Sequence, residues 1–207
     1  MKRSFFAPAV AVFFAVAPAM AATPMERTKG LLEALKGVHV PPEGGGLSAA
    51  QRGQNEAMFA TIDGFFDYDH MVDTPIAKHE ALFKGGVRER YRTAFRALIR
   101  AIAYPRSGTF LKAAKLQFGA VKQSGAEATV ALHTELAEED YSSDVMFYWG
   151  QRDAVWLLQD VSFDGASLVK DYANQFARLI TKDGAGGLVA KLESRLAKIQ
   201  SAQQGAN

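Results

Sequence analysis

The segment FDYDHMVD, residues 66–73, gathers side chains that can bind a metal ion or transfer a proton. Asp67, Asp69, His70 and Asp73 lie within it, and His79 follows a short distance along the chain. Carboxylate and imidazole groups suit zinc binding or general-base catalysis. Their spacing, however, fits neither the H-E-x-x-H motif nor an EF-hand loop. Aspartates also serve as helix caps and turn residues, so we assign no metal ligand and no catalytic residue here.

Ser167 is the other side chain that could be taken for a catalytic group, in this case a nucleophile. It follows the turn residues Asp164 and Gly165 and precedes an apolar segment with helical spacing. The G-x-S-x-G pattern of a nucleophile elbow is absent from this stretch, and serine is a favoured residue at the start of a helix. We therefore expect Ser167 to be an N-cap and the protein not to be an enzyme.

Four arginines recur at every fourth position of the segment 87–104, namely Arg88, Arg92, Arg96 and Arg100. On a helix this spacing gives a slowly drifting row, which we call the arginine stripe. One interpretation is a solvated helix face. The other is a surface that docks an acidic partner or anionic lipid headgroups, because guanidinium groups bind phosphate well.

The elements that would position these groups change in type along the chain. Apolar spacing predicts helices before and after a central block of short, β-rich segments that are separated by turn residues. The predicted helices are 24–37, 48–66, 87–104, 167–182 and 187–201, with Pro105 ending or kinking the third and glycines at 184–187 separating the last two. The predicted strands are 114–124, 127–136, 143–151 and 154–163. This order indicates an α+β fold, a four-stranded antiparallel sheet covered by helices.

The first residues have the features of a secretory signal peptide. Lys2 and Arg3 precede an apolar run over 5–17, and Ala19-Met20-Ala21 fits the cleavage pattern. The run of about 13 residues is shorter than the ~20 needed to span a bilayer. We expect residues 1–21 to be removed and 22–207 to form one soluble domain, with a disordered tail from about 201.

Charge and cysteine content narrow the possible functions. The chain has 24 basic and 22 acidic residues, and loss of Lys2 and Arg3 leaves 24 − 2 = 22 basic residues, hence no formal net charge. Nothing in this balance favours nucleic-acid binding. The sequence has no cysteine, which excludes disulfides and thiolate metal sites.

The stretch VWLLQDVSFDGASLVKDYANQF, residues 155–176, joins the last predicted strand to the next helix. Regular alternation places Trp156 and Leu158 on one strand face, and Val161 and Phe163 on the other. Both faces are therefore mostly apolar. A strand of this kind is either covered on both sides or borders a cavity.

The spacing W-x-x-x-D-V-x-x-x-G-x-S-L-V-x-x-Y-x-x-x-F in this stretch resembles the C-terminal motif of the MlaC, or toluene-tolerance, family of periplasmic phospholipid carriers. The matching residues are Trp156, Asp160, Val161, Gly165, Ser167, Leu168, Val169, Tyr172 and Phe176. The order of the predicted elements is also similar over nearly the whole mature chain. The sequence departs from the family pattern at Ala173, where arginine is usual, and at Pro105.

The resemblance implies an NTF2- or cystatin-like sheet whose helices enclose an apolar cavity for acyl chains. It implies a monomeric carrier in the periplasm of a Gram-negative bacterium, with bound phospholipid as cargo and no cofactor. Its expected partners are an inner-membrane MCE-type ABC transporter complex and an outer-membrane lipoprotein complex, which the carrier would connect by shuttling lipid.

A set of apolar and aromatic side chains is expected to contact the lipid. It comprises Tyr91, Phe95, Phe118, Val130, Leu132, Phe147, Trp149, Trp156, Leu158, Phe163, Leu168, Tyr172 and Phe176. For each of these residues the alternative is ordinary core packing, because aromatic residues at regular spacing usually pack inside a protein.

Three other functions remain open from the sequence. One is a carrier of a hopanoid or another apolar lipid. The second is an NTF2-like enzyme, which would need Asp67, Asp69 or Asp160 in the cavity beside His70 or His133. The third is an adaptor with a filled core that binds envelope proteins through the arginine stripe.

Overall fold

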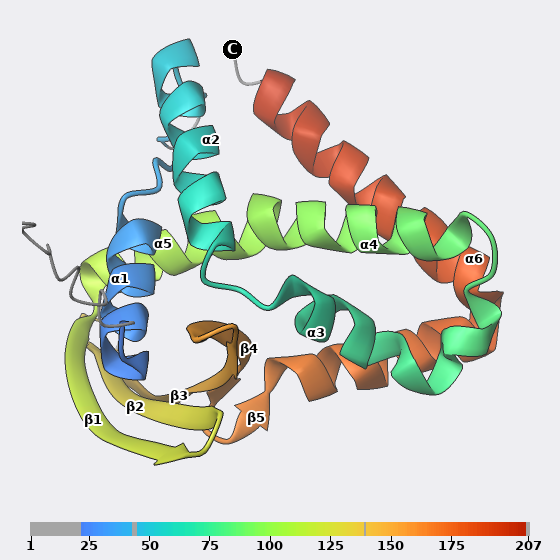
Figure 1. The fold of residues 1–207 in the computed structure, drawn as a ribbon. Helices are drawn as coiled ribbons and strands as arrows, with labels where there is room; N and C mark the ends of the chain where they lie inside the picture. Colours follow the sequence, from blue (N-terminus) through green and yellow to red (C-terminus); the bar gives the residue numbers. More distant parts are fainter. Residues whose placement is uncertain (1–21, 43–44, 139, 206–207) are drawn as a thin grey trace, which may run out of the picture.

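A computed structural model describes residues 22–42, 45–138 and 140–205, so the predicted signal peptide lies outside the described residues. Helices cover one side of a curved antiparallel sheet (Figure 1). This arrangement confirms the predicted α+β class. Among the described residues, no helix combines the length and the apolar character needed to cross a bilayer.

The first two helices start at matched capping boxes. Helix α1 (Pro24–Lys36) is capped by Thr23 with Glu26, and α2 (Ala49–Asp63) by Ser48 with Gln51. In each box the cap side chain and the third helical residue satisfy amides that would otherwise have no partner. Both starts agree within one residue with the predicted helices 24–37 and 48–66, whereas α2 ends three residues earlier than predicted.

The segment 66–73 is tied to the sheet and then turns into a short helix. Phe66 forms a bridge with Leu158, flanked by hydrogen bonds from the Leu158 amide to the Phe65 carbonyl (2.7 Å) and from the Asp67 amide to the Leu158 carbonyl (2.9 Å). Asp67 then accepts from the His70 amide (3.2 Å) and caps α3 (Tyr68–Asp73). A 3-10 helix, η1 (Thr74–Leu82), follows.

The long helix continues past Pro105, so of the two predicted outcomes, an end or a kink, the end is wrong. Helix α4 (Val87–Leu98) runs into a π-helical turn, η2 (Ile99–Ala103), and continues as α5 (Tyr104–Ala113), which has Pro105 in its first turn. Proline lacks an amide and its ring displaces the carbonyl of the preceding turn. The wider π turn accommodates this displacement without breaking the helix.

The sheet is an antiparallel meander with one more strand than predicted. Its strands are β1 (Lys115–Ser124), β2 (Glu127–Leu136), β3 (Tyr141–Arg152), β4 (Val155–Phe163) and β5 (Ala166–Ser167), paired in chain order. The fifth strand is added because Asp164 and Gly165 have positive φ angles of 50° and 83°. Such a turn folds the chain directly back, so that Ser167 pairs with Ser162.

Strand β4 contains a bulge that changes which side chains share a face. Trp149 pairs with Leu158 and Tyr148 with Asp160, which leaves Gln159 without a partner across the strand. The extra residue restarts the alternation. Leu158 and Val161 therefore lie on the same inner face, although regular alternation had placed them on opposite faces.

Helix α6 (Leu168–Gly205) begins where the sequence predicts and changes direction at the predicted glycines. The Lys170 amide donates to the Ser167 hydroxyl (3.1 Å), which confirms Ser167 as the N-cap. At Gly184 the backbone has φ 72° and ψ 173°, a conformation that essentially only glycine adopts, and the helix resumes in a new direction. Helical structure extends to Gly205, past the predicted end at residue 201.

Candidate functional site: an apolar cavity between sheet and helices

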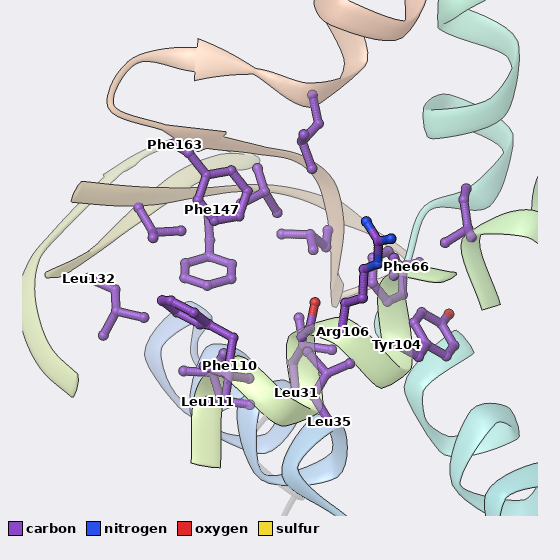
Figure 2. Close-up of a pocket in the computed structure, with 18 of the residues that line it drawn as sticks. Leu31, Leu35, Phe66, Tyr104, Arg106, Phe110, Leu111, Leu132, Phe147 and Phe163 are labelled. Atoms are coloured by element: carbon purple, nitrogen blue, oxygen red, sulfur yellow. The ribbon is translucent and has the colours of Figure 1, made fainter. Parts of the chain in front are cut away.

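A cavity of about 520 Å³ lies between the inner face of the sheet and the helices (Figure 2). This volume falls within the range of roughly 300–1,000 Å³ that small-molecule sites occupy. Its lining is almost entirely apolar. The lining residues are Leu31, Leu32, Leu35, Phe66, Met71, Phe95, Ile99, Ala103, Tyr104, Arg106, Ser107, Phe110, Leu111, Leu132, Thr134, Leu136, Tyr141, Val145, Phe147, Leu158, Val161, Phe163, Leu168, Val169 and Tyr172.

The sheet contributes its wall through cross-strand pairs on three neighbouring strands. Leu132 lies opposite Val145, and Phe147 lies opposite Val161. The bulge at Gln159 is what brings Val161 onto this face. As a result, β2, β3 and β4 together form one continuous apolar surface.

The helical wall comes from α1, the α4–α5 helix and the start of α6, with Met71 added from α3. Close contact between α1 and α5 depends on Gly108, because a Cβ there would lie 2.5 Å from the Leu35 carbonyl oxygen. As a result, Leu31 of α1 and Phe110 of α5 both line this side of the cavity (Figure 2). Helix α5 is thus a wall of the cavity that the sequence did not predict.

The other end of the sheet's inner face is filled by packing and does not border the cavity. Trp149 is 1% exposed, and its indole N–H donates to the Thr28 hydroxyl of α1 (3.0 Å). Val130, which is fully buried, and Trp156 belong to the same core. A buried indole with its N–H satisfied in this way is a structural anchor for α1.

The predicted lipid-contact residues divide into two groups by position. Those in the cavity lining are Phe95, Leu132, Phe147, Leu158, Phe163, Leu168 and Tyr172. Those outside the lining are Tyr91, Phe118, Val130, Trp149, Trp156 and Phe176. Direct contact with lipid remains a prediction, and the first group borders the space in which it would occur.

Three of the residues outside the lining have other contacts. Tyr91 and Phe176 pack edge to face at 5.9 Å behind Phe95, and the Tyr91 hydroxyl donates to the Val72 carbonyl (2.8 Å). Burial raises the pKa of Tyr91 well above its ordinary value, so its hydroxyl stays protonated. Phe118 lies on β1 under the ammonium group of Lys29, 5.3 Å from the ring centroid.

A polar network lies where the lining residue Tyr104 meets the end of α2. The hydroxyls of Tyr104 and Tyr68 each lie 2.7 Å from the same carboxylate oxygen of Asp63, and they also contact each other. Arg100 forms an ion pair with this carboxylate. Burial raises the pKa of both tyrosines, so the network holds neutral phenols around one paired carboxylate.

The acidic segment that suggested metal or acid–base chemistry is used for ion pairing. Asp67, 3% exposed at its side chain, pairs with Arg152 (3.0 Å), and Asp69 and Asp73 pair with the arginine stripe. Within the described ranges, no group of three or more metal-ligating side chains comes together. His133 pairs instead with Asp144 (2.7 Å), and neither residue lines the cavity.

The arginine stripe is engaged within the protein. Each of its members contacts a side chain of the segment that runs from the end of α2 through η1, and three of the four are ion-paired, which reduces the charge available to a partner. The contacts are Arg88 with Asp73 (3.2 Å) and Glu80 (2.5 Å), Arg92 with Asp69, Arg96 over the Tyr68 ring (4.3 Å), and Arg100 with Asp63. Docking through the stripe remains a prediction.

Comparison with known proteins decides the family. The family model described as MlaC protein matches residues 46–194, which is most of the chain. The chain belongs to the MlaC family. No curated protein is similar enough in sequence to match it.

The fold of this MlaC-family chain also matches a solved structure. The phospholipid-binding protein from Ralstonia solanacearum, in complex with a phospholipid, superposes with a TM-score of 0.64 at 17% sequence identity. The match covers 84% of this chain and 94% of the other. At this identity the likeness is one of fold.

The motif that marks the MlaC family in this sequence has a structural role here. Asp160 accepts from the amides of Val161 (2.8 Å) and Val169 (3.1 Å), and its other oxygen accepts from the Ser167 hydroxyl (2.5 Å). These bonds fix the direction in which α6 leaves the sheet. They also place Leu168 in the cavity lining.

Sequence reasoning missed the wall formed by α1 and α5. Leu31 and Leu35 lie one turn apart on α1, so the apolar face of this helix was visible in the sequence. The cavity that this face borders was not visible. For α5 the usable signal was Tyr104, Gly108 and Leu111 at one-turn intervals. Proline is tolerated in the first turn of a helix, which would have permitted that interpretation.

Proposed function

We propose that this chain is a soluble periplasmic carrier that holds the acyl chains of a phospholipid in the cavity and shuttles the lipid between membrane complexes. The observation that carries the proposal is the apolar lining between sheet and helices. Leu132, Phe147 and Leu158 from the sheet and Leu31 and Phe110 from the helices offer an acyl chain surroundings similar to a bilayer interior.

The energetics explain why such a cavity is needed. Each methylene group exposed to water costs ~0.8 kcal/mol, so a chain of about 16 carbons carries roughly 13 kcal/mol in water. A free lipid therefore leaves a membrane too rarely to cross an aqueous compartment at a useful rate. A carrier with an apolar cavity lowers this cost while it keeps loading and release nearly balanced.

Family membership and the fold both support the proposal. The structural neighbour from Ralstonia solanacearum is a phospholipid-binding protein that contains a phospholipid. The signal-like N-terminus supports export, and membership of the MlaC family supports partners at both membranes, namely an MCE-type transporter complex and an outer-membrane lipoprotein complex.

The alternative functions lack the features that they require. Among the described residues, the cavity lining contains no aspartate and no histidine, so an Asp–His pair for NTF2-like catalysis is not assembled there. An adaptor was expected to have a filled core, whereas this fold is hollow. A hopanoid carrier would share the apolar lining, and the identity of the bound lipid separates it from a phospholipid carrier.

The test is native mass spectrometry of the purified mature protein, followed by lipid extraction. We expect a bound mass that corresponds to phospholipid in a reproducible ratio. A protein that is repeatedly empty, and that takes up no phospholipid from vesicles, would contradict the proposal.

A further inference from the structure

Arg106 differs from every other described residue of the cavity lining because its side chain is charged. It lies in the first turn of α5 and is exposed to solvent. In Figure 2 its side chain lies beside those of Tyr104 and Phe66, whereas Leu132 lies at the other end of the cavity. The guanidinium thus borders the apolar space while it remains hydrated, so its charge carries no desolvation cost when no lipid is bound.

This guanidinium has no ion-pair or hydrogen-bond partner among the residues that the structure describes. Arginines nearby are paired, Arg100 with Asp63 and Arg152 with Asp67. Arg106 is therefore the charged group of the lining that is available for a ligand.

The neighbouring residue supplies a second free donor. The Ser107 hydroxyl belongs to the lining and makes no hydrogen bond with the described part of the chain. Among the other hydroxyls of lining residues, those of Tyr104 and Thr134 are already used, by Asp63 (2.7 Å) and by the Ser143 carbonyl (3.1 Å). Tyr141 and Tyr172 also line the cavity and make no hydrogen bond through their hydroxyls with the described residues, but neither is adjacent to a charged lining residue in the chain. Arg106 and Ser107 thus place a free guanidinium and a free hydroxyl on consecutive residues of the lining.

We propose that Arg106, with Ser107, binds the phosphate ester of the lipid whose acyl chains occupy the cavity. The inference rests on the proposed carrier function and adds a selection to it. The guanidinium fork donates two parallel hydrogen bonds to the two non-bridging oxygens of the phosphate ester. The hydroxyl can then donate to an ester oxygen of the same group, and a carboxylate has no third oxygen of this kind. The site thereby selects phospholipids over diacylglycerol, hopanoids and free fatty acids, whatever group is esterified to the phosphate.

The test measures lipid occupancy by native mass spectrometry on delipidated full-length mature protein. The protein is offered phosphatidylglycerol, diacylglycerol with the same acyl chains, or palmitate, each in detergent micelles. Arg106→Gln removes the charge and keeps most of the side-chain length. Arg195→Gln is the matched control, because Arg195 is exposed and lies outside the cavity lining.

We expect Arg106→Gln to weaken phosphatidylglycerol binding about tenfold, the effect of one charge-assisted hydrogen-bond site at a hydrated edge. Diacylglycerol binding should not change, Arg106→Lys should lie between the two proteins, and Arg195→Gln should match the wild type. Inorganic phosphate at millimolar concentration should not compete, since it lacks the chains that hold the ester in place.

Several results would overturn the inference. Equal weakening for phosphatidylglycerol and diacylglycerol would show that Arg106 acts through packing. An unchanged preference in Arg106→Gln would place the phosphate elsewhere, and palmitate binding that depends equally on Arg106, or competition by inorganic phosphate, would show a general anion site. A wild-type protein that binds none of the lipids would instead contradict the carrier function itself, so the two failures are distinguishable.

Discussion

Filling part of the cavity with a larger side chain should strongly weaken lipid binding without unfolding the protein. Leu132 is 2% exposed, lies on β2 and points into the cavity opposite Val145. The substitution Leu132→Trp places an indole in space that an acyl chain would occupy. An aromatic side chain is also well suited to a strand.

The magnitude follows from the volume that the indole takes up. Tryptophan has about six more non-hydrogen atoms than leucine, and each methylene that it displaces costs the lipid ~0.8 kcal/mol. Displacement of about three to six methylenes weakens binding by roughly 2–5 kcal/mol, which is on the order of 30-fold to several thousandfold. Lipid occupancy after purification, measured by native mass spectrometry, should fall accordingly.

The stability of the delipidated protein distinguishes a cavity from a filled core. Leu132→Trp should leave the free energy of unfolding unchanged or raise it, because the added atoms make contacts where none existed. The matched control is Leu188→Trp, since Leu188 is fully buried in α6 and lies outside the lining. There the same enlargement should cost about 1–3 kcal/mol by overpacking. Equal destabilisation by both substitutions in urea unfolding, or full lipid occupancy in a folded Leu132→Trp protein, would refute the reasoning.

Three further predictions concern the frame around the cavity. Tyr104→Phe removes one hydroxyl from the buried network and should lower the free energy of unfolding by about 1–2 kcal/mol. An unchanged free energy in urea unfolding would show that this hydroxyl does not stabilise the fold. Gly184→Ala should destabilise the fold by about 1–3 kcal/mol because alanine is strained at φ 72°. Gly186→Ala should be neutral or slightly stabilising, since no heavy atom lies within 4 Å of its added Cβ. Equal melting temperatures for the two variants would contradict this expectation. The hydrogen bond to the carboxylate of Asp144 raises the pKa of His133 in the folded state. The pair therefore stabilises the fold below the ordinary histidine pKa of about 6.5 and loses this effect as the pH rises through the raised value. At about pH 6 the wild-type protein should melt at a higher temperature than His133→Gln, and a difference that widens toward about pH 9 would refute the assignment.

The strands and the strand-to-helix turn could be predicted because their signals are local. Strand β2 has the predicted ends, and Asp164, Gly165 and Ser167 form the turn and cap that their residue types favour. The bulge at Gln159 could not be predicted in this way. Each half of β4 alternates correctly by itself, and only the pairing with β3 reveals that one residue is skipped.

The cavity was predictable in kind but not in its lining. Trp149 and Phe147 lie on the same strand face and are equally apolar, yet one packs on α1 and the other borders the empty space. Hydrophobicity reports that a side chain avoids water. It does not report whether protein or ligand atoms cover that side chain, which depends on how α1 and α5 approach the sheet.

The bulge at Gln159 gives β4 an unusual tolerance to a change in length. Removal of one residue from an ordinary strand exchanges its two faces from that point onward. Here the loss of Gln159 would instead restore regular pairing and leave Leu158 and Val161 both facing inward. What would disappear is its side chain, which lies against Gly150 and donates to Asp67 (3.2 Å). A relative whose strand is one residue shorter at this point could therefore keep the same cavity wall, while its buried carboxylate would depend on the bonds from Arg152 and the His70 amide alone.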